Sequence, residues 1–366
     1  MDLQQEIDMQ QRSLKTDHLT MSLGELMRMY VDRELVINPQ FQRLFRWTRE
    51  QKSRLIESIL LGIPIPSLFT YETAESRWEL VDGLQRMSTV LEFAGDLRDP
   101  VTDKKLPPSV LTAGRYLKGL ENAVWELNER TGGLSEEPLV EIGRPLQLAI
   151  RHCRIGLEIL KRPSDINTKY DLFQRLNSGG TGANPQELRN CAVVMVNPEF
   201  FEELRSLSNG AAFGRLVKSS EAQHKAQKEL EYLMRFLVYR YVPYDGKKDV
   251  EEYVTDGIVE LATSRRFGAD EKANFLDTFR LLEQTFGQDA LRGSRKVGFT
   301  GLEVIAVGIS FNLTSILKRK DPAAYISERR SAFWESDAVA RFTKGGLRGT
   351  QRIKDTIPFG KTWFAG

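Results

Sequence analysis

The chain has 366 residues, of which 41% are hydrophobic and 28% charged, and its 52 basic residues against 50 acidic ones leave a formal net charge of +2. This length and composition are typical of a globular protein with two domains. So balanced a total charge gives no sign of a nucleic-acid partner. The two cysteines, Cys153 and Cys191, lack the spacing of a disulfide framework or a metal site.

Missing features exclude further classes of protein. No apolar run is long enough to cross a membrane, and the polar, acidic N-terminus does not form a signal peptide. We therefore expect a cytoplasmic protein. The three histidines, His18, His152 and His224, stand in no metal-binding pattern, which argues against a histidine-metal nuclease. The lack of a GxSxG motif argues against a serine hydrolase.

Capping motifs predict the first two helices. Residues 1–19 are polar and without pattern, which predicts a mobile arm. A capping box at Ser22 and Glu25 then starts an apolar helical pattern. A second box, at residues 48–51, starts another helix, which Gly62 ends.

Three short segments have the hydrophobic pattern of strands: residues 67–72, 77–81 and 155–160. The second leads directly into Asp82-Gly83 and then into a helical pattern. Residues 95–150 indicate mostly loop and helix. A further helical pattern, from about residue 167, ends in a glycine-rich loop whose residues tolerate positive φ.

Beyond about residue 195 the pattern is helical nearly throughout, and its apolar stripes are typical of a buried core. We therefore predict an α+β protein in which a small mixed sheet with helices precedes a mostly helical domain. The predicted parts are a mobile arm (1–19), the mixed domain (20–195), the helical domain (196–343) and a basic tail (344–366).

The strongest candidate site is the turn between the second predicted strand and its helix. Backbone N–H groups at a helix start and the helix dipole favour an anion, and Arg86 adds a forked donor suited to phosphate oxygens. Gln85 could orient a water molecule, and Asp82 could cap the turn or hold a magnesium-bound water. Alternatively, Asp82-Gly83 is only a turn and Arg86 a surface residue.

Two other segments could take part. In the extended segment 41–47, aromatic residues alternate with Arg43 and Arg46, a composition that suits either a stacked base and a phosphate or simple core packing. Arg175 lies near the end of the helix over 167–176, where positive charge is favoured in any case. Asn177 and the glycines after it serve first as a helix C-cap.

Taken in order, these segments resemble one family. They are similar to the DGQQR-motif domain that forms the N-terminal part of the GmrSD modification-dependent restriction enzymes and of the phosphorothioate-sensing SspE proteins. Leu84 departs from the family pattern, which usually has glutamine there. The motifs that carry the resemblance are Asn38-Pro39-x-Phe41-Gln42-Arg43-x-Phe45-x-Trp47, residues 53–66, Val81-Asp82-Gly83-Leu84-Gln85-Arg86 and Phe173-x-Arg175-Leu176-Asn177-Ser178-Gly179-Gly180.

The layout is also similar, more distantly, to the ParB and sulfiredoxin superfamily. Residues 83–86 take the place of the ParB turn that holds nucleotide phosphates, and residues 171–175 look like its second box. The asparagine of that box is Leu172 here, so the resemblance assigns no metal ligand. It implies catalytic roles for Asp82, Gln85 and Arg86, and nucleotide contacts from Gln42, Arg43, Gly83, Arg86, Arg175, Asn177, Gly179 and Gly180.

The resemblance implies a domain that binds and hydrolyses a nucleoside triphosphate with Mg²⁺ and controls a nuclease of the HNH type. No HNH pattern follows residue 195, so we expect the nuclease of this defence system to be a separate subunit. The basic residues after 344 suit either DNA or a protein partner, or are simply solvated. The alternatives are a non-hydrolytic module that binds DNA or senses its modification, and a nuclease acting alone. Oligomeric state is left open.

Overall fold

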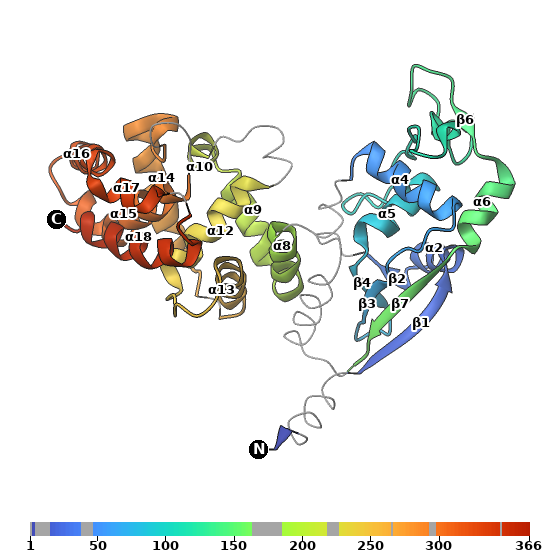
Figure 1. Cartoon of the computed structure of the whole chain (residues 1–366), viewed down its shortest axis with the longest axis horizontal. Helices are drawn as coiled ribbons and strands as arrows, with labels where there is room; N and C mark the ends of the chain where they lie inside the picture. Colours follow the sequence, from blue (N-terminus) through green and yellow to red (C-terminus); the bar gives the residue numbers. More distant parts are fainter. Residues whose placement is uncertain are drawn as a thin grey trace. The chain divides into compact units, whose positions relative to one another are not determined.

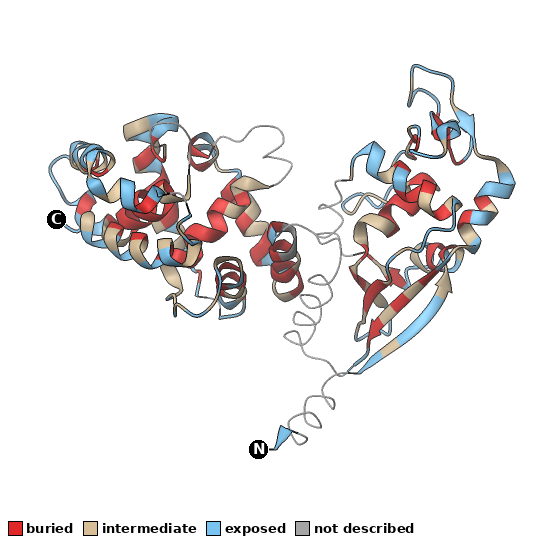
Figure 2. Ribbon diagram, viewed as in Figure 1, coloured by how far each residue is buried: buried red, intermediate tan, exposed pale blue. Residues whose placement is uncertain are grey.

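The computed structural model describes residues 2–3, 15–37, 47–162, 185–217, 227–264, 266–292, 298–344 and 346–366. Contacts between residues divide the chain into two compact units, residues 1–182 and residues 183–366 (Figure 1). Each unit has its own buried interior (Figure 2). The predicted α+β class is confirmed, because the first unit holds a mixed sheet and the second is mostly helical.

The sheet of the first unit has five strands in the order β1-β7-β3-β4-β2. Two pairs are antiparallel, β1 with β7 and β3 with β4, and two are parallel, β3 with β7 and β2 with β4. The strands are β1 (Thr16–Ser22), β2 (Leu35–Val36), β3 (Leu68–Glu72), β4 (Trp78–Asp82) and β7 (Arg154–Leu160). The strands predicted over 67–72, 77–81 and 155–160 are therefore confirmed.

The helices of the first unit bury their apolar faces in one core with the sheet. The predicted caps are present: the Ser22 hydroxyl accepts a hydrogen bond from the Glu25 N–H, and Thr48 and Gln51 form a reciprocal capping box. The helices are α2 (Leu23–Val31), α4 (Arg49–Leu60), α5 (Leu84–Phe93), α6 (Gly143–His152) and the 3₁₀ turn η1 (Lys118–Leu120). Two further short strands, β5 (Ala123–Val124) and β6 (Val140–Glu141), pair in parallel.

The second unit is a helical assembly with an aromatic core. Phe213, Phe236, Phe275 and Phe279 meet there with ring centroids 4.8 to 5.6 Å apart. Its helices are α8 (Pro185–Val196), α9 (Pro198–Ser208), α10 (Ala211–Leu216), α12 (Lys228–Tyr241), α13 (Val250–Ser264), α14 (Ala269–Phe286), η2 (Gly287–Asp289), the π-helix η3 (Gly301–Ala306), α15 (Val307–Leu317), α16 (Pro322–Glu335), α17 (Asp337–Thr343) and α18 (Gly349–Trp363).

A charged network joins three helices of this unit. The Glu251 carboxylate of α13 accepts hydrogen bonds from Arg189 of α8 at 2.5 Å and from Arg235 of α12. The side chain of Arg189 is fully buried and that of Arg235 is 3% exposed. Because a buried guanidinium is costly without a partner, Glu251 holds the three helices together.

Two segments differ from the sequence prediction. Residues 16–19 were expected to belong to a mobile arm, but they form the first half of β1, whose backbone pairs with β7. Residues 344–366 were expected to be a tail, but most of them form α18. That helix buries Ile353 and packs against α15 and η3. In both cases tertiary partners decide the structure of a segment whose own composition is polar.

Candidate functional site

The turn singled out by the sequence connects β4 directly to α5. Gly83 takes φ +90°, in the left-handed region, and is the N-cap of α5. A Cβ atom at this position would lie 2.1 Å from Cδ2 of Leu68, which is buried. The conformation and the close approach of β3 together require glycine, so the predicted sharp turn is present.

Arg86 lies in the first turn of α5 and bonds to groups on both sides of this turn. Its Nη2 donates to Asp82 Oδ2 at 2.8 Å. Its Nη1 donates to the carbonyl oxygen of Ser67 at 3.1 Å and to that of Pro66. Arg86 therefore ties the turn to the segment that precedes β3.

The Arg86 side chain is 14% exposed and that of Asp82 is 34% exposed, so this is a partly buried ion pair at the end of the sheet. Burial lowers the pKa of the Arg86 guanidinium, and the Asp82 charge opposes that effect. Arginine remains a cation under these conditions because its ordinary pKa is far above neutral. Asp82 and Arg86 thus act first as a structural pair.

The N-terminus of α5 lacks a side-chain cap among the described residues. The Met87 N–H is the donor that bonds back to the Gly83 carbonyl, at 2.9 Å. A helix start without a side-chain cap carries the positive end of the helix dipole. This is the local arrangement that suits an anion.

Gln85 connects the turn to the second candidate segment. Its Oε1 accepts a 3.2 Å hydrogen bond from the backbone N–H of Trp47, whose side chain packs against the core. The structure therefore brings Trp47 next to the Gly83 turn. Six predicted nucleotide contacts lie outside the described residues: Gln42, Arg43, Arg175, Asn177, Gly179 and Gly180.

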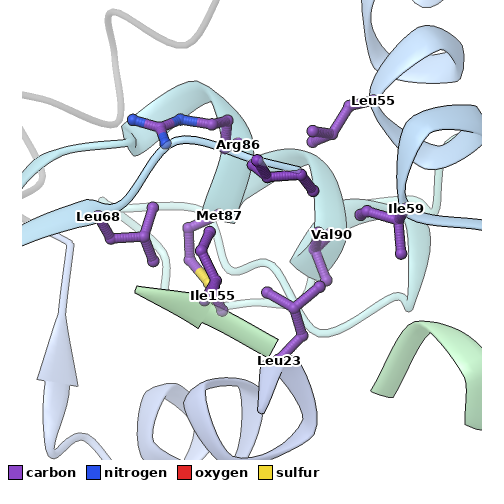
Figure 3. Close-up of a pocket in the computed structure, with 9 residues that line it drawn as sticks. Leu23, Leu55, Ile59, Leu68, Arg86, Met87, Val90 and Ile155 are labelled. Atoms are coloured by element: carbon purple, nitrogen blue, oxygen red, sulfur yellow. The ribbon is translucent and has the colours of Figure 1, made fainter. Parts of the chain in front are cut away.

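A small pocket opens beside Arg86 (Figure 3). Apart from Arg86 its lining is aliphatic or thioether: Leu23, Leu55, Ile59, Ile65, Leu68, Met87, Val90 and Ile155. The space inside is that of about one water molecule. A nucleotide base does not fit there, so we interpret the pocket as a small packing defect in the core next to the turn.

Glu57 is a buried carboxylate that sequence reasoning missed. It accepts hydrogen bonds from the backbone N–H groups of Arg115 at 3.2 Å, Tyr116 at 2.6 Å and Leu117 at 2.7 Å. The bond from Leu117 and those from its two neighbours lower the pKa of the Glu57 carboxyl, although desolvation opposes them. In the sequence Glu57 is one of several charged residues on α4. Only the folded structure, in which the backbone of residues 115–117 donates hydrogen bonds to it, distinguishes it from the others.

Among the described residues, no group of three or more His, Cys, Asp or Glu side chains is placed to hold a metal ion. The helices in that part of the chain include none with the length and hydrophobicity of a membrane span. Around Gly83 the groups that can contact a ligand are the backbone N–H groups at the start of α5, the Asp82 carboxylate, the Gln85 amide and the Arg86 guanidinium.

The chain matches one known protein family over about half of its length. The family model described as "GmrSD restriction endonuclease, N-terminal domain" matches residues 23–194. Residues 23–194 belong to the GmrSD N-terminal domain family. This confirms the resemblance drawn from the four motifs and indicates a role related to restriction. No curated protein and no solved structure matches the chain significantly.

The residues that match the GmrSD family model extend from the first compact unit into the first helix of the second. The match begins at α2, directly after β1, and contains the other four strands of the sheet and the Gly83 turn. It ends inside α8, a helix that packs on α9 and α13 of the second unit. Arg189, which Glu251 holds, thus lies in the last part of the GmrSD domain.

Proposed function

We propose that the GmrSD domain binds a nucleoside triphosphate at the start of α5 and hydrolyses it with Mg²⁺, as the regulatory subunit of a restriction system that acts with a separate nuclease. The observation that carries the proposal is the passage from β4 through Gly83, at φ +90°, into a helix whose N-terminus has no side-chain cap among the described residues. Such a turn is well suited to phosphate oxygens.

The contacts of Arg86 support the same site. Nη1 is engaged by two carbonyl oxygens and Nη2 by Asp82, which holds the guanidinium beside the helix start. Of the five N–H donors, the one on Nε and one of the two on Nη2 have no protein acceptor among the described residues, and these can bond a phosphate oxygen. Arg86 would then stabilise the charge that develops on the transferred phosphoryl group.

The remaining roles are assigned to neighbouring groups. Gln85 would position the attacking water through its amide, with its Oε1 already fixed by the Trp47 N–H. Asp82 would hold Arg86 and bond a water of the hydrated Mg²⁺. Gln42, Arg43, Arg175, Asn177, Gly179 and Gly180 would complete the phosphate site. The separate nuclease subunit is part of the proposal; residues 195–366, in which His224 is the single histidine, do not supply the site of a histidine-metal nuclease.

The test is phosphate release by the purified full chain with Mg²⁺ and each of the four common nucleoside triphosphates. Arg86→Lys keeps the charge but loses the forked donor, and we expect it to lower the rate about 100-fold. Arg54→Lys, the same substitution at an exposed arginine on α4, is the matched control and should keep the wild-type rate. Turnover by a folded Arg86→Lys protein at the wild-type rate would refute the assignment.

A second candidate is a module that binds nucleotide or DNA phosphate without hydrolysis. It is favoured by one observation: the carboxylate nearest the turn, Asp82, is engaged by Arg86 at 2.8 Å and is not free to act as a base. Saturable nucleotide binding in calorimetry, together with no phosphate release above the Arg86→Lys background, would select this candidate. DNA binding at the turn would show steep weakening with salt.

A further inference from the structure

Cations that lie on aromatic rings gather on the second unit, outside the GmrSD match. The Arg319 guanidinium lies 3.8 Å from the ring centroid of Tyr325. The Arg329 guanidinium lies 5.8 Å from that ring and 5.5 Å from the ring of Trp363. Cation–π contacts of this kind hold a guanidinium in place and leave its N–H edge available to acceptors.

Backbone acceptors fix this group across α16 and α18. The Tyr325 hydroxyl donates to the Phe364 carbonyl at 3.2 Å, and Trp363 Nε1 donates to the Arg329 carbonyl at 2.9 Å. On α18, Lys361 Nζ lies 4.9 Å from the Phe311 ring of α15. Arg319, Arg329 and Lys361 thus lie on or directly after three helices, α15, α16 and α18, of which α15 packs against the other two (Figure 1).

These cations differ from others of the same unit in their partners. Arg319, Arg329 and Lys361 form no ion pair with any carboxylate in the described parts of the chain. By contrast, Arg205, Arg266 and Arg280 are paired with Glu202, Glu260 and Asp277. Lys318 and Lys320 are exposed beside Arg319 and add to the positive charge.

The described part of the second unit exposes few large apolar side chains, although one of them, Leu317, adjoins Lys318. Of the large hydrophobic residues described in the second unit, Leu317 at 48% and Leu276 at 37% are the exposed ones. A membrane surface or a protein partner would need more apolar contact than this. A rigid polyanion needs only the cations.

We propose that Lys318, Arg319, Lys320, Arg329 and Lys361 form a contact surface for the phosphate backbone of duplex DNA. The charge and the fixed guanidinium groups identify a polyphosphate partner, and the restriction family of residues 23–194 selects duplex DNA among such partners. The surface does not recognise a particular base sequence, because contacts to the phosphate backbone position a protein on DNA without contacting the bases. It is independent of the nucleotide site on α5.

The experiment is fluorescence anisotropy of a labelled 30-base-pair duplex titrated with the full chain, without nucleotide and with EDTA, at several KCl concentrations. The test variant is Arg319→Gln/Arg329→Gln/Lys361→Gln. We expect it to weaken binding at least about tenfold and to reduce the slope of log K against log salt by about 3. The matched control, Arg205→Gln/Arg266→Gln/Arg280→Gln, removes the same charge from the same unit and should bind like wild type.

Equal weakening by both triple variants would overturn the proposal, because net charge alone would then explain the binding. So would wild-type affinity and slope in the test variant, or tighter binding of a polyglutamate peptide than of the duplex. Lys318→Gln/Lys320→Gln changes two exposed side chains and carries the test if the triple variant does not fold. Its expected effect is a slope reduced by about 2.

Discussion

Asp82 and Arg86 form a 2.8 Å ion pair that joins the last residue of β4 to the first turn of α5. The pair is partly shielded, with side chains 34% and 14% exposed. A double-mutant cycle with Asp82→Asn and Arg86→Gln should therefore give a coupling free energy of about 1 kcal/mol in urea unfolding. The control pair, Arg33 with Asp103, is 68% and 57% exposed and should give a coupling near zero.

The Gly83 turn should not tolerate a side chain. Gly83→Ala adds a Cβ against Leu68 in a left-handed conformation, and we expect it to lower the free energy of unfolding by about 3 kcal/mol. Gly62→Ala is the control, because Gly62 also has positive φ, at +68°, but nothing lies within 4 Å of the added atom. It should cost about 1 kcal/mol. Equal costs for the two variants would contradict the close approach.

Glu57 should make stability depend on pH. Its pKa is lowered in the folded state, so its contribution is complete above the unfolded pKa of about 4.3 and is lost as the pH falls below that value. We expect Glu57→Gln to be less stable than wild type at pH 7, and the difference to shrink between pH 5 and pH 3. Urea unfolding across this range measures it, with exposed Glu126→Gln as the control. A difference independent of pH would argue against the carboxylate's role.

Glu251 and Glu260 provide a matched comparison on α13, since both carboxylates are 45% exposed. The Arg189 partner of Glu251 is fully buried, whereas the Arg266 partner of Glu260 is 61% exposed. Glu251→Gln should thus lower the free energy of unfolding by about 2–3 kcal/mol, and Glu260→Gln by about 0.5 kcal/mol. Similar values would mean that the two buried arginines that Glu251 holds, Arg189 and Arg235, do not make its loss more costly.

The packing of α18 should depend on Gly360. A Cβ there would lie 2.5 Å from the Val304 carbonyl oxygen, so Gly360→Ala should push α18 away from η3 and cost about 3 kcal/mol. Gly214→Ala, in α10, meets nothing within 4 Å and should raise stability by about 0.5 kcal/mol, because alanine favours helix. Thermal unfolding of the two variants distinguishes a packed helix from a free tail.

Local rules predicted much of the first unit. The caps at Ser22 and Thr48, the three central strands and the passage from Asp82 to α5 depend on neighbouring residues, which the sequence displays directly. The family could also be recognised, because its motifs are short and occur in order. The same reasoning failed at residues 16–19 and at α18, where a polar segment is ordered by contacts far along the chain.

For the candidate site, the sequence by itself determined the residue types: a glycine at a strand–helix turn, followed by an amide and an arginine. Only the tertiary structure decided their partners. It placed the Ser67 carbonyl against Arg86 and the Trp47 N–H against Gln85. A hydrogen bond between segments about 20 to 40 residues apart depends on how the sheet and helices pack, and no local pattern encodes that geometry.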